Sequence, residues 1–259
     1  MRGGRKSERI MTIVKTCRLG IVTVLGLLPS WVVAGPDHIE GPLDAGSTRT
    51  GAQTIYKNSP SLRQIFGELD LLRSGVDSED MYLFRILDAE QFSARTDGVD
   101  GSFAMFDSQL WLFRLDTMNP NNAFGLLGNN NSGPLTMGSL IRGPATDLTA
   151  QDIPGPGDYL IAITAAGRVP VSAGGPIFQF GSPTEISGPD GPGGLQPHTD
   201  WVGEGSGKGT YMIAMTGSAG FCPPTGCPAL PPYGVVFAGA MLCAAGVGIV
   251  GYRKAQRGV

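Results

Sequence analysis

The amino-acid sequence predicts an all-β protein whose short strands pair in a sandwich or barrel. Glycine (40) and proline (20) together make up 60 of the 259 residues, about twice the share of ~12% found in an average protein. Both residue types destabilise helix interiors, so this excess favours a turn-rich β fold. From about Ile65 onward, short apolar runs alternate with turn residues, which is the pattern of a β-sandwich.

Two pairs of similar segments support the same prediction. Tyr82–Ile86 is echoed by Trp111–Leu115, and each segment places two aromatic side chains and one aliphatic side chain on one strand face, with an arginine on the other. We therefore expect Trp111 to be buried. Gly157–Thr164 is echoed by Gly209–Thr216, in which tyrosine and apolar residues alternate after a glycine turn. We interpret this second pair as core strands of one sandwich.

The N-terminal 34 residues predict export. Met11–Ala34 has the features of a secretory signal peptide: Lys15 and Arg18 form its positive region, and Leu19–Val33 forms its apolar core. Small residues at positions −3 and −1 place the cleavage site after Ala34. An uncleaved N-terminal anchor is the alternative. Residues 35–61, which are rich in Gly, Pro, Ser and Thr, are expected to form an extended lead-in before the folded domain.

The C-terminal end predicts attachment to a membrane. Residues 221–233 form a Cys- and Pro-rich stalk, residues 234–252 are apolar, and residues 253–259 carry a basic cluster. A helix of ~18 apolar residues rises ~27 Å, just enough to cross a bilayer core, and the basic tail is expected to stay cytoplasmic.

A five-residue motif ends the stalk and begins the span: Leu230, Pro231, Pro232, Tyr233 and Gly234. The order of motif, span and basic cluster resembles the tails of PEP-CTERM-type and sortase-type substrates. No Pro-Glu-Pro is present, and Tyr233 stands where sortase substrates have threonine. Processing by a sorting transpeptidase and a plain single-pass anchor are therefore both open.

Cysteine and charge usage agree with an exported protein. Cys222 and Cys227 enclose a four-residue loop in the stalk, and in an oxidising compartment we expect a local disulfide between them. Residues 35–229 contain 10 basic and 21 acidic residues, a formal charge of −11. Because a nucleic-acid binder needs a basic surface, nucleic acid is not an expected partner.

Five further segments follow one another in a characteristic order: Asp80–Ile86, Phe92–Ala94, Phe106–Phe113, Gly157–Ile163 and Pro170–Phe178. This order resembles the bacterial pre-peptidase C-terminal type of β-sandwich, and more closely a group of secreted, PEP-CTERM-associated proteins built on that module. The resemblance covers Ile65–Gly217. It implies an antiparallel, jelly-roll-like extracellular domain, placed here at residues 62–220, without catalysis of its own. The group often has an Asn-Asp-Asp turn where this chain has Asn129-Asn130-Asn131.

The chain lacks the usual sequence marks of an enzyme. Its two histidines, His38 and His198, have no metal-ligand partner at a suitable spacing, and no Gly-x-Ser-x-Gly motif is present. Gly203–Gly209 resembles a phosphate loop, but Gly209 stands where Ser or Thr must bind magnesium. We therefore expect no enzymatic activity and no required cofactor.

Acidic turns are the candidate metal ligands. Asp77 and Asp80 lie together, as do Asp97 and Asp100, and Asn129–Asn131 adds amide oxygens. Ca²⁺ takes six to eight oxygen ligands, although neither acidic group nor the asparagine turn reproduces the EF-hand spacing. Ordinary acidic turns, or an acid pair of the kind that glycosidases use, are the alternatives.

These features predict an exported cell-surface or extracellular protein with a structural, adhesive or matrix-assembly role. Its expected partners are the membrane, a sorting transpeptidase and an extracellular polysaccharide. The alternative is a carbohydrate-binding module or weak glycoside hydrolase. Trp201, which has polar neighbours, is the candidate for stacking on such a ligand.

Overall fold

The computed structural model describes residues 35–41, 43–57, 61–69, 77–205 and 207–223. The expected signal peptide, sorting-like motif, membrane span, basic tail and Cys227 lie outside these ranges. Within them the regular structure is all β, apart from one short 3-10 turn, η1 (Val99–Gly101). The described residues contain no helix with the length and apolarity that a membrane crossing requires.

The described strands form three sheets. The six-stranded sheet has, in order, β1 (His38–Ile39), β3 (Gln64–Leu69), β15 (Gly209–Thr216), β5 (Ser93–Arg95) and β9 (Leu140–Ile141), with β6 (Phe103–Ala104) also paired to β15. The seven-stranded sheet has, in order, β13 (Ile186–Ser187), β8 (Ala123–Asn129), β7 (Ser108–Leu115), β10 (Gly157–Ala165), β4 (Glu79–Ile86) and β16 (Ser218–Ala219), with β2 (Gln53–Thr54) beside β4. The three-stranded sheet has, in order, β12 (Gly175–Pro176), β11 (Val169–Ser172) and β14 (His198–Val202).

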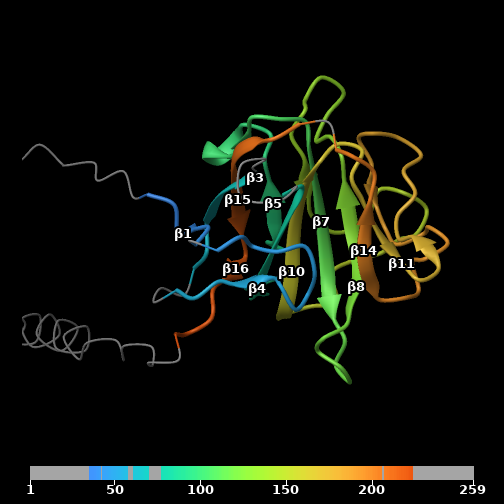
Figure 1. Cartoon of the computed structure of the whole chain (residues 1–259), viewed down its shortest axis with the longest axis horizontal. Coiled ribbons are helices and arrows are strands. Elements are labelled where there is room, and N and C mark those ends of the chain that lie inside the picture. The colour runs from blue at the N-terminus through green and yellow to red at the C-terminus, as the bar shows by residue number, and fades with distance from the viewer. Residues whose placement is uncertain (1–34, 42, 58–60, 70–76, 206, 224–259) are drawn as a thin grey trace, which may run out of the picture. The chain divides into compact units, whose positions relative to one another are not determined.

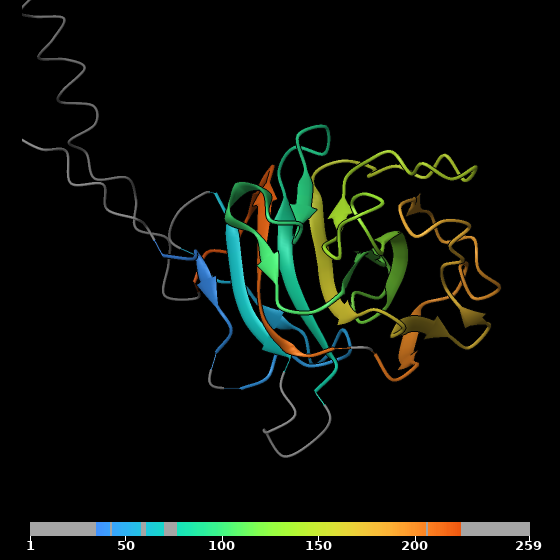
Figure 2. The same ribbon diagram turned by 90° about the horizontal axis from the view of Figure 1, so that it is seen from above.

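The seven-stranded sheet lies between the other two (Figures 1 and 2). Its strands β4, β7 and β10 are buried along nearly their whole length, because both of their faces are covered. Strands covered on both sides have near-continuous apolar sequences instead of strict alternation, as Tyr159–Ala165 in β10 illustrates.

The main hydrophobic core fills the space between the six-stranded and seven-stranded sheets. Tyr159, Ile161 and Ile163 of β10 face Tyr211 and Ile213 of β15 across this core. The two segments that echo each other in the sequence are thus β10 and β15, one in each facing sheet. Their prediction as core strands of a single domain is confirmed.

A second hydrophobic cluster lies on the other face of the seven-stranded sheet. Met81, Trp111 and Phe113 from this sheet pack there against Phe178 and Trp201. The expected burial of Trp111 is confirmed, and its indole N–H donates a 2.9 Å hydrogen bond to Thr164 Oγ1.

In the other echoed pair, β4 and β7, equivalent residues face opposite sides of the sheet, although their similar sequences suggest the same side. In the ladders with β10, Ile161 is opposite Tyr82 on one side and Leu112 on the other. Tyr82 therefore points into the main core, whereas Trp111, its counterpart in the echo, points into the second cluster. The two segments are thus offset by one residue relative to β10, and an offset of one residue reverses the face of every side chain.

The sheets are mixed rather than purely antiparallel, which corrects the expected arrangement. β1 runs parallel to β3, and β2 runs parallel to β4. Both parallel strands come from residues 35–61, the expected lead-in, which therefore adds to both large sheets. The connections to their partner strands are long enough to return the chain in the parallel direction.

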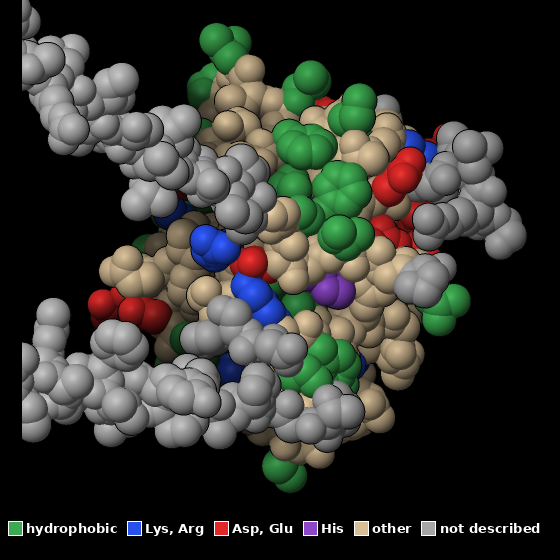
Figure 3. Space-filling view, turned by 90° about the vertical axis from the view of Figure 1, so that its left-hand side faces the viewer, with side chains coloured by type: hydrophobic (Ala, Val, Ile, Leu, Met, Phe, Trp, Pro, Cys, Tyr) green, Lys and Arg blue, Asp and Glu red, His purple; other side chains and the backbone are tan. Residues whose placement is uncertain are grey.

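The outer face of the six-stranded sheet carries partly exposed apolar side chains (Figure 3). Phe66, Met212 and Phe103 lie side by side on three adjacent strands, and the rings of Phe66 and Phe103 have centroids 6.5 Å apart. We refer to these three residues as the outer apolar row.

Substitution of Gly125 by alanine is expected to destabilise the fold. A Cβ atom at Gly125 would lie 2.9 Å from Phe178 Cζ and still closer to the Ile177 side chain, so the second cluster would have to shift. Overpacking of this kind costs about 1–3 kcal/mol, measurable by chemical denaturation. Gly133→Ala is the matched control, because its Cβ would meet nothing closer than 3.8 Å; equal effects of the two substitutions would contradict the packing described.

Candidate metal centre

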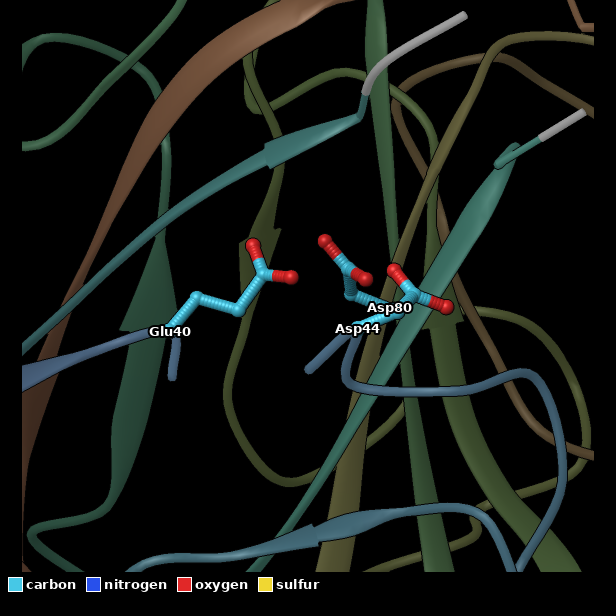
Figure 4. A group of neighbouring side chains, drawn as sticks. All are labelled: Glu40, Asp44 and Asp80. Atoms are coloured by element: carbon cyan, nitrogen blue, oxygen red, sulfur yellow. The ribbon is translucent and has the colours of Figure 1, made fainter. Parts of the chain in front are cut away.

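Three acidic side chains meet at the side of the fold where the lead-in crosses strand β4. One carboxylate oxygen each from Glu40, Asp44 and Asp80 lies within 4.8 Å of the other two. Figure 4 shows the Glu40 side chain reaching toward the two aspartates. Asp80 is one of the predicted candidate ligands, whereas Glu40 and Asp44 were not expected.

Backbone hydrogen bonds hold the lead-in in place. The Glu40 N–H donates to Phe66 O at 2.8 Å, which continues the pairing of β1 with β3. The Gly46 N–H donates to Asp44 Oδ2 at 3.3 Å, and Gly46 O accepts a hydrogen bond from Met81 N at 3.1 Å. The two lead-in carboxylates are therefore positioned by the same contacts that attach this segment to the sheets.

Asp80 differs from its neighbours because it is wholly buried. Its Oδ2 accepts a 2.5 Å hydrogen bond from the Tyr211 hydroxyl, which lies 2.6 Å from the Tyr82 hydroxyl. Since the Tyr211 proton goes to Asp80, Tyr82 donates to Tyr211. The second oxygen, Asp80 Oδ1, is buried without a hydrogen-bond partner in the protein.

This environment disfavours the charged form of Asp80. Burial raises the pKa of its carboxyl well above the usual value, and the negative charges of Asp77, Glu40 and Asp44 raise the pKa further, while the Tyr211 hydrogen bond opposes the shift. A buried carboxylate that is repelled by its neighbours needs a proton or a cation nearby.

A glycine makes room for the tyrosine pair. Gly67 is opposite Tyr211 in the β3–β15 ladder, and a Cβ atom there would lie 2.7 Å from the Tyr82 hydroxyl oxygen and even closer to that of Tyr211. A small cavity of about 130 Å³ lies beside this point. Its lining consists of Ile39, Glu40, Asp44, Phe66, Gly67, Glu68 and Asp77.

Asp77, the other predicted ligand from this region, lines the same cavity. Its backbone carbonyl accepts a 2.8 Å hydrogen bond from Lys208 Nζ. Glu79, the neighbour of Asp80 in sequence, is directed to the face of β4 opposite Asp80 by strand alternation. There it pairs with Arg168, whose Nε lies 2.9 Å from Glu79 Oε2.

The predicted ligands Asp97 and Asp100 are engaged in a different way. Arg95 donates two hydrogen bonds to Asp97, at 2.7 and 2.8 Å, and its Nη1 lies 3.7 Å from Asp100 Oδ2. Although partial burial opposes the shift, hydrogen bonds from Arg95 and Ser132 lower the pKa of Asp97. Arg95 therefore offsets part of the negative charge of this acidic turn.

In the asparagine turn the side chain of Asn129 serves the fold, whereas the Oδ1 atoms of Asn130 and Asn131 are buried without a hydrogen-bond partner. The Asn129 amide donates to Asn131 O and Glu185 O, at 3.1 and 2.8 Å, and its Oδ1 accepts from Leu140 N at 2.8 Å. A shared metal ion requires ligand atoms from several side chains close together. Among the acidic, histidine and cysteine side chains of the described ranges, those of Glu40, Asp44 and Asp80 meet this requirement.

Trp201 lies in the interior and not at the surface. It is 3% exposed, and its indole N–H donates to Ser47 O at 2.5 Å. Its ring contacts those of Trp111, Phe113 and His198. The expected stacking surface is therefore not presented by Trp201 in this structure. Its polar sequence neighbours were misleading because alternation in β14 buries the tryptophan while Asp200 and Val202 stay exposed.

The remaining predicted site residues are only partly covered by the structure. Cys222 lies within the described ranges and Cys227 does not, so the disulfide between them stays a prediction. The five residues of the sorting-like motif also lie outside. No protein-family model matches the chain, and no curated protein matches it either.

The His198 ring should make the fold sensitive to mild acid. Burial between Phe113 and Trp201 lowers the pKa of His198 from 6.5 to about 4, against the opposing effect of Asp200. Below pH 6.5 the unfolded chain therefore binds more protons than the folded one. Stability should fall between pH 6.5 and pH 4, by at most about 3 kcal/mol from this group.

Chemical denaturation across this pH range tests the effect. His198→Phe keeps an aromatic ring in place and removes the titrating group, so the variant should lose less stability than the wild-type protein as the pH falls. Parallel pH profiles for the two proteins would contradict a buried neutral His198.

Proposed function

We propose that this chain is an exported, non-catalytic protein of the cell surface, in which a jelly-roll-like β-sandwich has a structural, adhesive or matrix-assembly role. The chain is secreted through residues 1–34 and held by the membrane segment at residues 234–252, transiently or permanently. The domain between them is the part that faces the extracellular space.

The arrangement of the two ends of the described fold carries this proposal. Lys57 joins both ends: its Nζ lies 2.6 Å from Asp37 Oδ1, and its N–H donates to Phe221 O at 2.9 Å. Phe221 in turn donates to Ile55 O at 2.7 Å. The start of the expected stalk at Phe221 thus lies beside the point where the mature chain is expected to begin.

This arrangement suits a tethered module. Both ends leave from the same region, which lies on the side of β1 in Figure 1, so a tether at the C-terminal end leaves the remaining surface free for contacts. Export followed by anchoring would also place the acidic surface of the domain in the extracellular medium, where divalent cations are plentiful.

The acidic residues do not favour the glycoside hydrolase alternative. A glycosidase needs two carboxyl groups about 5–10 Å apart across an open cleft. Asp80 is completely buried, and Glu79 lies on the opposite face of β4 in an ion pair with Arg168. These two acids therefore cannot flank one sugar.

The carbohydrate-binding alternative is supported by a different surface from the one expected. The outer apolar row presents two aromatic rings on a sheet face, and nearby Met105 is 73% exposed. Partly exposed aromatic side chains on a flat sheet are suited to stacking on sugar rings. An extracellular polysaccharide is therefore the second candidate partner, with Phe66 and Phe103 in the role first assigned to Trp201.

Intact-mass spectrometry of the protein from membrane, cell-wall and medium fractions tests the surface assignment. A mature form that begins at Gly35 and ends near residues 230–233, free or with an adduct, is expected if the tail is processed by a transpeptidase. A form that begins at Gly35 and still ends at Val259 in the membrane fraction would make the tail a plain anchor. Recovery of an uncleaved chain in the cytoplasm would contradict export itself.

Binding to polysaccharide from the producing cells tests the second candidate. The double variant Phe66→Ala/Phe103→Ala should lose binding, on the order of tenfold or more, because each stacked ring contributes about 1 kcal/mol. Leu148→Ala is the matched control, since this side chain is fully exposed in a loop away from the row. Equal binding by both variants would remove the outer apolar row from consideration.

A further inference from the structure

We propose that Glu40, Asp44 and Asp80 bind a single Ca²⁺ ion that clasps the lead-in segment to the sandwich. The ion would join two residues of the segment 35–57 to the buried carboxylate of β4. It would act whether or not the chain is anchored to a membrane.

The spacing of the carboxylates fits one ion. Oxygen ligands bind Ca²⁺ at about 2.4 Å, so two ligands of the same ion can be at most about 4.8 Å apart. The three carboxylate oxygens satisfy this limit for every pair. The cavity beside them has room for water molecules that would complete the six to eight ligands of Ca²⁺.

The second, independent observation is the free oxygen of Asp80. This side chain is wholly buried, and its Oδ2 is held by Tyr211 while Oδ1 has no partner in the protein. A buried carboxylate oxygen without a partner is destabilising unless a cation or proton satisfies it. Tyr211 thus fixes the orientation of the carboxylate, and the remaining oxygen is available to a ligand.

The charge of the group selects a divalent ion. When all three carboxyl groups are ionised they carry a charge of −3, and a divalent cation offsets more of this charge than a monovalent cation does. All ligand atoms are carboxylate oxygens, which hard cations prefer. Ca²⁺ fits better than Mg²⁺, because Mg²⁺ demands near-ideal octahedral geometry and loses its water reluctantly, whereas Ca²⁺ tolerates an irregular set of carboxylates and waters.

Such an ion would couple metal binding to the docking of the lead-in. Glu40 follows β1 directly, and Asp44 precedes the turn that is bonded to Met81. Without the ion, Glu40 and Asp44 of the lead-in lie near the buried carboxyl group of Asp80, and their negative charges disfavour its ionised form. With the ion bound, the same charges hold the two parts together.

Calorimetric titration of Ca²⁺ into the full-length protein, combined with thermal unfolding, tests the site. We expect saturable binding of one ion and a rise in Tm of about 3–6 °C once Ca²⁺ reaches tenfold the Kd. Hydrogen exchange should show slower exchange of the lead-in amides, residues 38–46, in the presence of Ca²⁺.

Two substitutions separate metal binding from folding. Asp44 is exposed, so Asp44→Asn should fold normally and lose Ca²⁺ affinity on the order of tenfold. Asp80→Asn keeps the shape and the acceptor for Tyr211, and should unfold at a higher temperature than the wild-type protein without Ca²⁺ yet show no Ca²⁺ response. Asp100→Asn, in the turn where Asp97 pairs with Arg95, is the control and should respond to Ca²⁺ as the wild-type protein does.

Three results would overturn the proposal. One is a folded wild-type protein that shows neither heat nor a Tm shift at about 5 mM Ca²⁺, well above the Kd of typical extracellular sites; Asp80 would then be satisfied by a proton alone. Another is an equal Ca²⁺ response in Asp44→Asn and the wild-type protein. The third is a response that Asp100→Asn abolishes, which would move the site to the other acidic turn.

Discussion

The burial of the seven-stranded sheet on both faces is the constraint on which the rest of this structure depends. Most residues of β4, β7 and β10 are buried, so each buried polar group they carry must find a partner inside the protein or remain costly. Thr164 illustrates the solution on one face, where it accepts from the Trp111 indole and donates to Arg168 O. Asp80 illustrates the exception on the other face, where one carboxylate oxygen is satisfied by a tyrosine and the other is not.

The lead-in segment has two structural roles that follow from this constraint. Its short strands β1 and β2 pair with β3 and β4, and an edge strand covered in this way is protected from pairing with another molecule. The same segment carries Glu40 and Asp44 to the buried Asp80. The packing of the lead-in against the sheets therefore both covers the strand edge and assembles the acidic cluster. A substitution that displaces the lead-in would disturb both.

The distribution of charge separates this cluster from the other acidic residues of the domain. Residues 35–229 have a formal charge of −11, yet several carboxylates lie beside arginines: Asp97 with Arg95, Asp158 with Arg85, and Glu79 with Arg168. In the cluster of Glu40, Asp44 and Asp80, burial raises the pKa of Asp80, and the negative charges of Asp77, Glu40 and Asp44 raise it further.

The sequence by itself determined the β class, the strands of the core and which residues of a strand share one face. Alternation is a local property of an extended chain and can be read from the sequence. It also identified Asp77 and Asp80 as candidate ligands. Only the tertiary structure decided which face of each strand meets which layer. Tyr82 and Trp111 occupy equivalent places in similar segments but enter different clusters, since the ladder with β10 offsets them by one residue. Trp201 is buried because strands distant in sequence cover it, and Glu40 joins Asp80 because a parallel strand returns the lead-in to the sheet. Contacts between distant segments depend on register and layer order, which no local pattern of residues encodes.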